Sequence, residues 1–421
     1  MTVHFFRWSA FAGCGFFLLA CPLHAEVQYQ LEKVVELSRH GVRSPTPDNR
    51  RETEAATQRA WPRWTTPDGE LTAHGYRAVV NKGRWQGAHY RELGLLSAGC
   101  PSPSEIYVRA SPLQRTRATA EALTEGAFPG CSVPVHYATG GIDPLFQSEK
   151  FALSKTDPAQ ELAAKRARAG DLAALQQRLH PTITLLKHAV CAPHNGCSFF
   201  DRPWQFRQTK SGHTYVQGLS VMASTVETLR LGYSENLPFN KLAWGNITSA
   251  AQITALFPLL TANFDLSNDV LYMAQRRGSV LLYAMLQALE PEKKPPVTRW
   301  LLLVAHDTNI AMVRTLMGFH WQLPGYGRGN IPPGSSLVFE RWRDRQSGER
   351  YLRVYFQGQS LDALRQPEPI NIRHPLLRQE WHQPGCNKTA VGILCPYEYA
   401  MSQMRKNLDF SAVAPPDVVL Q

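Results

Sequence analysis

The segment Trp300–Ala305 (WLLLVA) constrains the fold more than any other part of the chain, because it is an uninterrupted apolar run. A strand of this kind is typical of a sheet that is covered on both faces. Two further strands are predicted over 30–37 and 105–110, and each is followed by a polar loop and then by a helical pattern. The pattern after the first strand begins at Thr72, and the pattern after the second begins at Gln114. This alternation of strand, loop and helix predicts an α/β fold.

The middle of the chain follows another pattern, with helical periodicity and few strand-like runs. Its helical segments are 158–179, 219–231 and 269–289. The full length of 421 residues also exceeds that of an ordinary single domain. We therefore predict an α/β domain built from residues 26–150 and 291–421, interrupted by a mainly helical insertion of residues 151–290. Later strands are predicted over 336–341 and 351–356, and a helix over 308–317.

The first 25 residues have the features of an export signal. Trp8–Ala20 is a 13-residue apolar run, too short to span a bilayer, and small residues precede a cleavage site that we expect after Ala25. Leu18–Cys21 (LLAC) also resembles a bacterial lipobox, which would place a lipid anchor on Cys21. A buried N-terminal helix is disfavoured because the run has no polar face. No later segment is apolar enough to be a transmembrane helix, so we expect an exported protein, either free or lipid-anchored.

Six cysteines remain after such a cleavage, and an even number in an exported chain indicates three disulfides. The pairs Cys191–Cys197 and Cys386–Cys395 would each close a short loop, and Cys100–Cys131 follows by elimination. Zinc binding is disfavoured because no Cys-x-x-Cys occurs and the histidines lack the spacing of metal ligands. We therefore expect no metal and no cofactor.

The balance of charge is basic, with a formal net charge of +11. Removal of residues 1–25 would take away Arg7 and no acid, which leaves +10. The basic residues are scattered, with no run of five or more, so binding of nucleic acid is not indicated. An anionic membrane surface or a small anionic substrate would also suit a basic balance, and the small anionic molecule remains open as the partner.

Polar clusters follow three of the predicted strands. Arg39-His40-Gly41-Val42-Arg43 comes after the first strand, Arg115 just after the second, and His306-Asp307 directly after the apolar run. In open α/β sheets, ligands bind beyond the carboxyl ends of the strands. We therefore expect these residues to share one site.

The residue types in these clusters suit phosphate chemistry. Guanidinium groups present forked donors that match phosphate oxygens. A neutral imidazole is a nucleophile at mildly acidic pH, and a carboxylic acid can protonate a departing alkoxide. Together they would form a complete phosphatase that needs no metal. A non-catalytic binder of phosphorylated ligands is the alternative, but it would need neither His40 nor Asp307.

Two motifs carry a resemblance to a known family. Residues 38–46 (SRHGVRSPT) resemble the RHGxRxP signature of the histidine acid phosphatases, and residues 304–309 (VAHDTN) resemble their downstream HD element. Shorter matches extend the resemblance over nearly the whole mature chain. They lie at 114–116, 143–146, 331–334 and 338–341. The likeness is greatest to bacterial periplasmic phytases and to their glucose-1-phosphatase relatives.

The resemblance implies roles for single residues. His40 would be the phosphorylated nucleophile and Asp307 the proton donor to the leaving group. The phosphate would be bound by Arg39, Arg43, Arg115 and His306. Candidate residues for binding the rest of the substrate are Thr46, Arg277 and Glu227. For Glu227 a plain surface charge is the competing interpretation.

Arg115 competes with Arg117, which lies two residues further along the same predicted helix. Two such residues point to different faces, and the resemblance favours Arg115. Outside the cluster, Asp143 is expected to cap a turn and His213 to be structural. The sequons at Asn246 and Asn387 would stay bare in a bacterial protein.

The resemblance also implies the architecture and the substrate class. The fold would be a phosphoglycerate-mutase-like mixed sheet flanked by helices, with the helical insertion covering the site. The protein would be a monomeric bacterial protein, either periplasmic or secreted. The predicted disulfides agree with the bacterial branch, although a further long-range pair known there is missing.

Two residues favour phytate (inositol hexakisphosphate) as the substrate. Phytases of this branch tend to carry RHG and HDTN, as here at Gly41 and Thr308, whereas the glucose-1-phosphatases tend to carry RHN and HDSN. A glucose-1-phosphatase, or another sugar-phosphate phosphatase, remains the alternative. A phosphomutase is disfavoured, because those enzymes usually act in the cytosol and pair the nucleophile with a glutamate.

Overall fold

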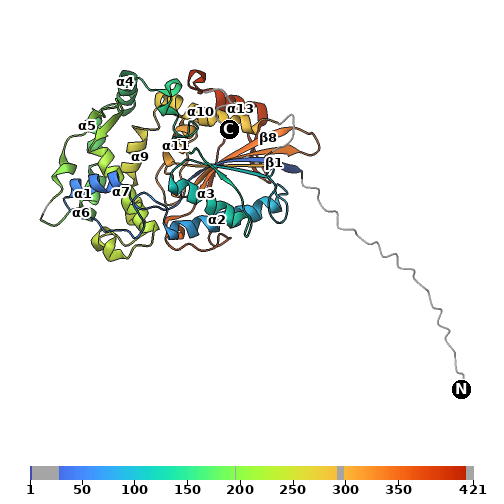
Figure 1. Ribbon diagram of the computed structural model, residues 1–421, viewed down its shortest axis with the longest axis horizontal. Coiled ribbons are helices and arrows are strands. Elements are labelled where there is room, and N and C mark those ends of the chain that lie inside the picture. Colours follow the sequence, from blue (N-terminus) through green and yellow to red (C-terminus); the bar gives the residue numbers. More distant parts are fainter. Residues whose placement is uncertain (2–27, 195, 292–297, 414–421) are drawn as a thin grey trace.

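The structure is a computed structural model that describes Met1 and residues 28–194, 196–291 and 298–413 (Figure 1). The predicted export signal and Cys21 lie outside the described residues. Within the part of the chain that is described, no helix combines the length and the apolar character that crossing a membrane requires.

A mixed sheet forms the centre of the molecule, with β1 at its middle. Its strands run in the order β10-β11-β8-β7-β1-β6-β2-β3, and β9 pairs with β8. Their bounds are β1 Tyr29–Arg39, β2 Ile106–Ala110, β3 Val135–His136, β6 Trp300–Ala305, β7 Ser336–Asp344, β8 Arg350–Gly358, β9 Leu377–Glu380, β10 Asn387–Thr389 and β11 Gly392–Pro396. β1, β6, β2 and β3 are parallel, whereas β7, β8 and β11 continue the sheet antiparallel. The predicted α/β fold with a mixed sheet is confirmed.

Helices cover both faces of this sheet, as Figure 1 shows. One face carries α2 (Ala73–Glu92) and α3 (Gln114–Ala127), and the other carries α10 (Leu271–Leu289), α11 (Asp307–Met317) and α13 (Tyr397–Arg405). Alternate residues of β6 therefore point into different cores: Leu302 and Val304 pack with the α2–α3 face, and Leu301 and Leu303 with the other. All six residues of β6 are buried, as its uninterrupted apolar sequence predicts.

The middle of the chain is mainly helical, with one hairpin. Its helices are α4 Pro158–Ala169, α5 Leu172–Arg178, α6 His180–Val190, α7 Leu219–Ser234, α8 Ala250–Thr254 and α9 Phe257–Asp265, and the hairpin is β4 Gln205–Gln208 with β5 Thr214–Gln217. The predicted helix over 158–179 is wrong as a single element. Gly170, at φ 60°, ends α4, and the Asp171 side chain caps α5 by accepting from the N–H groups of Ala173 and Ala174.

Packing crosses both boundaries of the predicted helical insertion. α1 (Pro47–Thr57) lies against α7, and α10 packs on β1 and α11. α12 (Leu361–Arg365) also contacts α7. The division of the chain into two domains therefore stays a prediction.

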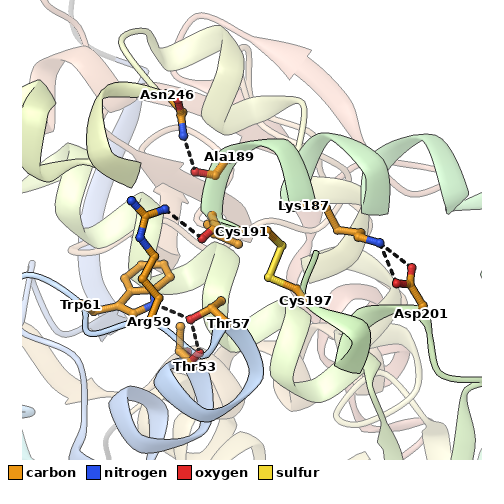
Figure 2. The surroundings of a disulfide bond; sticks show 11 residues. Thr53, Thr57, Arg59, Trp61, Lys187, Ala189, Cys191, Cys197, Asp201 and Asn246 are labelled. Atoms are coloured by element: carbon orange, nitrogen blue, oxygen red, sulfur yellow. Dashed lines mark hydrogen bonds and ion pairs between the residues drawn. A yellow bond between two sulfur atoms is a disulfide. The ribbon is translucent and has the colours of Figure 1, made fainter. Parts of the chain in front are cut away.

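The three predicted disulfides are present: Cys100–Cys131, Cys191–Cys197 and Cys386–Cys395. Figure 2 shows the second of them at the C-terminal end of α6. There Asn246 donates to the Ala189 carbonyl over 3.0 Å, and Arg59 donates to the Val190 carbonyl over 3.5 Å. The segments that follow α1 and precede α8 are thus fastened to the end of α6.

A hydrogen bond between two helix termini predicts how stability depends on pH. The Thr72 hydroxyl, which caps α2, donates to the carboxyl group of Glu235 at the end of α7. Burial raises the pKa of Glu235 to about 7, although Thr72 and Arg77 act in the opposite direction. Because the folded state then holds this proton more tightly than the unfolded state, the free energy of unfolding should fall as pH rises from about 4.5 to about 7.

The isosteric variant Glu235→Gln tests this pH dependence. Partial solvent screening limits the expected contribution to on the order of 1 kcal/mol. Tm measured between these two pH values should decline less in Glu235→Gln than in the wild type. Parallel Tm curves for the two proteins would contradict the assignment.

Candidate active site

The parallel strands bring the predicted clusters to one edge of the sheet. β1 and β6 pair in the register Arg39 with Ala305, and β2 pairs with β6 in the register Ala110 with Val304. The residues that follow these strands, His40, His306 and Ser111, are therefore neighbours. The ring centroids of His40 and His306 lie 5.7 Å apart, and Ser111 Oγ lies 3.1 Å from His306 Nε2.

His40 is held so that one ring nitrogen keeps a free lone pair. Its side chain is buried, and Nδ1 lies 2.9 Å from the Gly41 carbonyl oxygen. A carbonyl can only accept, so Nδ1 carries the proton in the neutral ring and Nε2 does not. Burial lowers the pKa of His40 well below its usual value, and Arg39, Arg115, Arg43 and His306 lower it further. The ring therefore stays neutral and nucleophilic in acid.

Three arginines surround this imidazole. Arg39 is fully buried, and its Nη1 donates to the Ile331 carbonyl over 2.6 Å. Arg43 donates to the Ser44 carbonyl over 2.8 Å. Burial, followed by the charge of Arg43, lowers the pKa of Arg115 to about 10, which leaves it cationic at neutral and acidic pH.

These arginines retain donors for a ligand. Among the described residues, the buried Nε atoms of Arg39, Arg43 and Arg115 have no hydrogen-bond partner. A buried donor without an acceptor is costly, and a bound phosphate would satisfy such groups. The cluster is therefore built to receive an anion.

His306 and Asp307 open α11. The backbone N–H of His306 donates to Asn309 Oδ1 over 3.2 Å, and Asn309 Nδ2 donates to the Phe146 carbonyl over 2.9 Å, so this helix start is fastened in place. Asp307 Oδ2 lies 3.0 Å from Arg39 Nη2, and Asp307 Oδ1 accepts from the Thr308 N–H over 2.9 Å.

The charges around Asp307 fix its protonation without a ligand. Burial would raise its pKa, but Arg39, Arg230, Arg43 and His306 outweigh burial, and the net shift is downward. Burial and the charge of Arg115 are the main causes that lower the pKa of His306. Without a ligand, Asp307 is therefore a carboxylate. A phosphate dianion among the arginines would offset their charge and favour the protonated acid.

Glu227 lies inside this cluster, so its interpretation as a plain surface charge is wrong. Its side chain is 14 % exposed, and Oε1 lies 2.6 Å from Arg39 Nη2. Its other oxygen pairs with Arg230, one helical turn further along α7. Arg230 in turn donates to Asn330 Oδ1 over 2.5 Å. Glu227 thus holds Arg39 from the helical side of the site.

Arg230 was not predicted from the sequence. It is 2 % exposed and contributes to the electrostatic field at Asp307. An arginine inside the apolar stretch of α7, three residues after an acid, is the signal that could have identified it.

The other candidates lie at or beyond the margin of the cluster. Thr46 caps α1, with Oγ1 accepting from the Asn49 N–H over 3.2 Å. Its methyl group borders Gly69, whose carbonyl accepts from Arg115 over 3.3 Å. Arg277 is on α10, and its guanidinium lies 3.5 Å from His213 Nε2 on the β4–β5 hairpin, not against the other arginines.

Arg117 and Asp143 each have a partner outside the arginine cluster. Arg117 lies over the Tyr137 ring at 4.7 Å, whereas Arg115 faces His40, so the two do point to different faces. Asp143 accepts from the Leu145 N–H over 2.9 Å and thereby caps its turn, as predicted. It also pairs with Arg109.

Comparisons with known proteins show which proteins this chain is similar to. Residues 30–357 match the family model described as the histidine phosphatase superfamily, branch 2. Glucose-1-phosphatase from Salmonella typhimurium is 31 % identical over 92 % of this chain and 96 % of its own length. Phytase AppA from Escherichia coli is 29 % identical over 88 % of this chain and 90 % of its own length.

Two solved structures are similar over nearly their whole length. Klebsiella sp. ASR1 phytase has a TM-score of 0.92 and 65 % identity, covering 93 % of this chain and 100 % of its own. Hafnia alvei phytase in complex with tartrate has a TM-score of 0.83 and 31 % identity, with the same two coverages.

Proposed function

The chain belongs to branch 2 of the histidine phosphatase superfamily and is a histidine acid phosphatase, and we propose that it is an exported phytase with His40 as nucleophile and Asp307 as proton donor. The observation that carries the proposal is the neutral His40 ring, with Nε2 unprotonated, beside the buried Arg39 and Arg43 and the half-buried Arg115. Such a ring can attack phosphorus, while the arginines neutralise the charge of the phosphoryl group in transfer.

The mechanism we propose is a double displacement. His40 Nε2 forms a bond to phosphorus as the bond from phosphorus to the ester oxygen breaks, and Asp307 gives its proton to that oxygen. Water then attacks the phosphohistidine, Asp307 takes up a proton from the water, and phosphate and free His40 are regenerated. Arg39, Arg43, Arg115 and His306 bind the phosphoryl oxygens in both steps.

Binding of the substrate supplies the acid that this scheme needs. The cations around Asp307 keep it ionised without a ligand, and a phosphate dianion offsets them. A substrate that arrives as a monoanion can also bring the proton with it. The scheme therefore favours an acidic pH optimum.

Two observations favour phytate over a sugar phosphate. The Klebsiella phytase, at 65 % identity, is much more similar to this chain than the Salmonella glucose-1-phosphatase, at 31 %. Gly41 is also closely packed: a Cβ there would lie 2.8 Å from Val79 Cγ2 and 3.0 Å from Leu71 Cδ1. The asparagine that glucose-1-phosphatases tend to carry would require these two side chains to shift.

Phosphate release from inositol hexakisphosphate and from glucose 1-phosphate, at about pH 4.5 with EDTA present, tests the substrate. We expect a higher kcat/KM for the inositol ester than for the sugar ester. Chelation should cause no loss of activity, because arginines neutralise the charge of the phosphoryl group. Preference for the sugar ester would support the second candidate, a glucose-1-phosphatase. Loss of activity in EDTA would contradict the mechanism.

We also propose that residues 1–25 direct export to the periplasm and that residues 151–290 form a helical insertion beside the site. The three disulfides support export, because such bonds persist in oxidising compartments. Glu227 and Arg230 support the second statement, since α7 contributes them to the cluster. The monomeric state and the lipid anchor on Cys21 stay predictions.

A further inference from the structure

A buried ion pair lies behind the nucleophile and has no part in the chemistry described above. Lys82 on α2 and Glu36 on β1 have side chains that are 1 % and 0 % exposed, and Lys82 Nζ lies 3.0 Å from Glu36 Oε1. Glu36 is three residues before Arg39 on the strand that ends at the site. This pair is therefore built into the support of the nucleophile.

The pair is hydrogen-bonded on every side. Lys82 Nζ donates to the Gly334 carbonyl over 3.0 Å, contacts Ser336 Oγ and lies 3.4 Å from Ser38 Oγ. Glu36 Oε1 accepts from Ser336 Oγ over 2.5 Å, and Glu36 Oε2 accepts from Gln86 Nε2 over 2.8 Å. The pair thus joins α2, β1 and the start of β7.

One of these partners leads directly to the site. Residues 331–335 form a turn before β7, which we call the 331–335 turn. Its Gly334 N–H donates to the His40 carbonyl over 2.9 Å, and its Ser335 carbonyl accepts from the Arg39 N–H over 2.8 Å. Its Ile331 carbonyl accepts from the Arg39 guanidinium over 2.6 Å. The turn therefore fixes the backbone of both residues and one side chain.

Stability alone does not explain why such a pair is buried here. Desolvation of two charges offsets most of their attraction, and well-packed apolar residues of similar volume are often as stable. Catalytic geometry is a stricter requirement, since groups must be held within about 0.5 Å and a misplacement of about 1 Å can cost on the order of 100-fold in rate. The Lys82 ammonium group, which donates to the 331–335 turn at the Gly334 carbonyl, meets that requirement.

We propose that Lys82 and Glu36 are positioning residues, which clamp the 331–335 turn to β1 and thereby set the position of His40 and Arg39. Lys82 holds the Gly334 carbonyl, and Glu36 keeps the ammonium group charged and centred. The inference rests on the proposed role of His40 as nucleophile. Its main effect is on the turnover step, because Glu227 and Asp307 still hold the Arg39 guanidinium when the pair is removed.

The double variant Glu36→Met/Lys82→Met tests the proposal, because it removes both charges and leaves apolar side chains of similar length. Turnover is measured with p-nitrophenyl phosphate, which reports on the phosphatase reaction whatever the natural substrate is. We expect Tm within about 5 °C of the wild type, kcat lower by about 10- to 100-fold and KM changed by less than about three-fold. An unaltered kcat in the folded double variant would overturn the proposal.

A matched control separates positioning from loss of a buried pair. Glu340 and Arg353 form another buried pair on β7 and β8, bonded to Trp342 and Tyr355 and not to the 331–335 turn. Glu340→Met/Arg353→Met should lose stability, because Glu380 then loses its partner Arg353, without loss of kcat. An equal fall of kcat in this control would show that any buried pair has the effect, and the proposal would fail.

A milder variant covers the case in which the double variant does not fold. Ser336→Ala removes the hydroxyl that bridges Lys82 and Glu36, and it should lower kcat several-fold at constant KM. A wild-type kcat in Ser336→Ala would then contradict the proposal. Failure of the proposed function is recognised separately, since His40→Ala would in that case remain active on the same ester.

Discussion

Replacement of His40 by alanine should lower kcat/KM on any phosphate ester by about 10⁵-fold, with the fold and the binding of inorganic phosphate retained. The loss is expected to be this large because, in the described part of the chain, no other imidazole is placed to replace it. His306, the nearest one, has Nε2 within 3.1 Å of Ser111 Oγ. The measurements are steady-state kinetics at acidic pH, Tm and phosphate binding by calorimetry.

A buried histidine outside the site provides the control for this prediction. His74 is on α2, and its Nε2 lies 2.8 Å from the Leu364 carbonyl. His74→Ala should lower Tm but leave kcat/KM within about three-fold, because its cost is one hydrogen bond and a cavity. If His40→Ala kept a substantial part of the wild-type rate, another group would have to be the nucleophile.

Replacement of Asp307 by asparagine should have an effect that depends on the leaving group. An alkyl ester such as glucose 1-phosphate or inositol hexakisphosphate needs protonation of its leaving oxygen, so kcat should fall by about 10²- to 10⁴-fold. An aryl ester such as p-nitrophenyl phosphate releases a stable anion and should lose far less. The measurement is the ratio of kcat for the two kinds of ester in wild type and variant.

Glu227→Gln is the matched comparison, because it removes a carboxylate from the same guanidinium group of Arg39 without removing the proton donor. This change should weaken turnover of both kinds of ester by similar factors. An equal loss on both esters in Asp307→Asn as well would mean that Asp307 acts through Arg39 alone. The assignment of Asp307 as the general acid would then be withdrawn.

The parts of the fold that could be predicted are those that local sequence determines. β6 is apolar at every position because both of its faces are covered, and the run WLLLVA states this directly. α2 begins where predicted because the Thr72 side chain accepts from the Gly75 N–H. His40 and Asp307 could likewise be proposed because each lies within two residues of the end of a strand.

What could not be predicted depends on contacts between distant segments. Glu227 was weighed as a surface charge, since nothing near it in the sequence indicates that Arg39, 188 residues away, is its partner. Arg230 was missed for the same reason. The Lys82–Glu36 pair joins α2 to β1. The sequence around either residue does not indicate that the other is its partner.

The β4–β5 hairpin and the break in the helix at Gly170 were missed for a different reason. Both depend on short polar stretches whose local preferences compete with helical periodicity, and packing decides between them.

Identification of the phosphorylated residue during turnover tests the central claim most directly. The wild-type enzyme is mixed with saturating p-nitrophenyl phosphate, whose good leaving group makes formation of the intermediate fast relative to its hydrolysis, and is quenched in alkali, in which phosphohistidine survives. Mass spectrometry of the digest then locates the added phosphoryl group. Our account predicts that it is on His40, whereas a phosphoryl group on any other residue would contradict it.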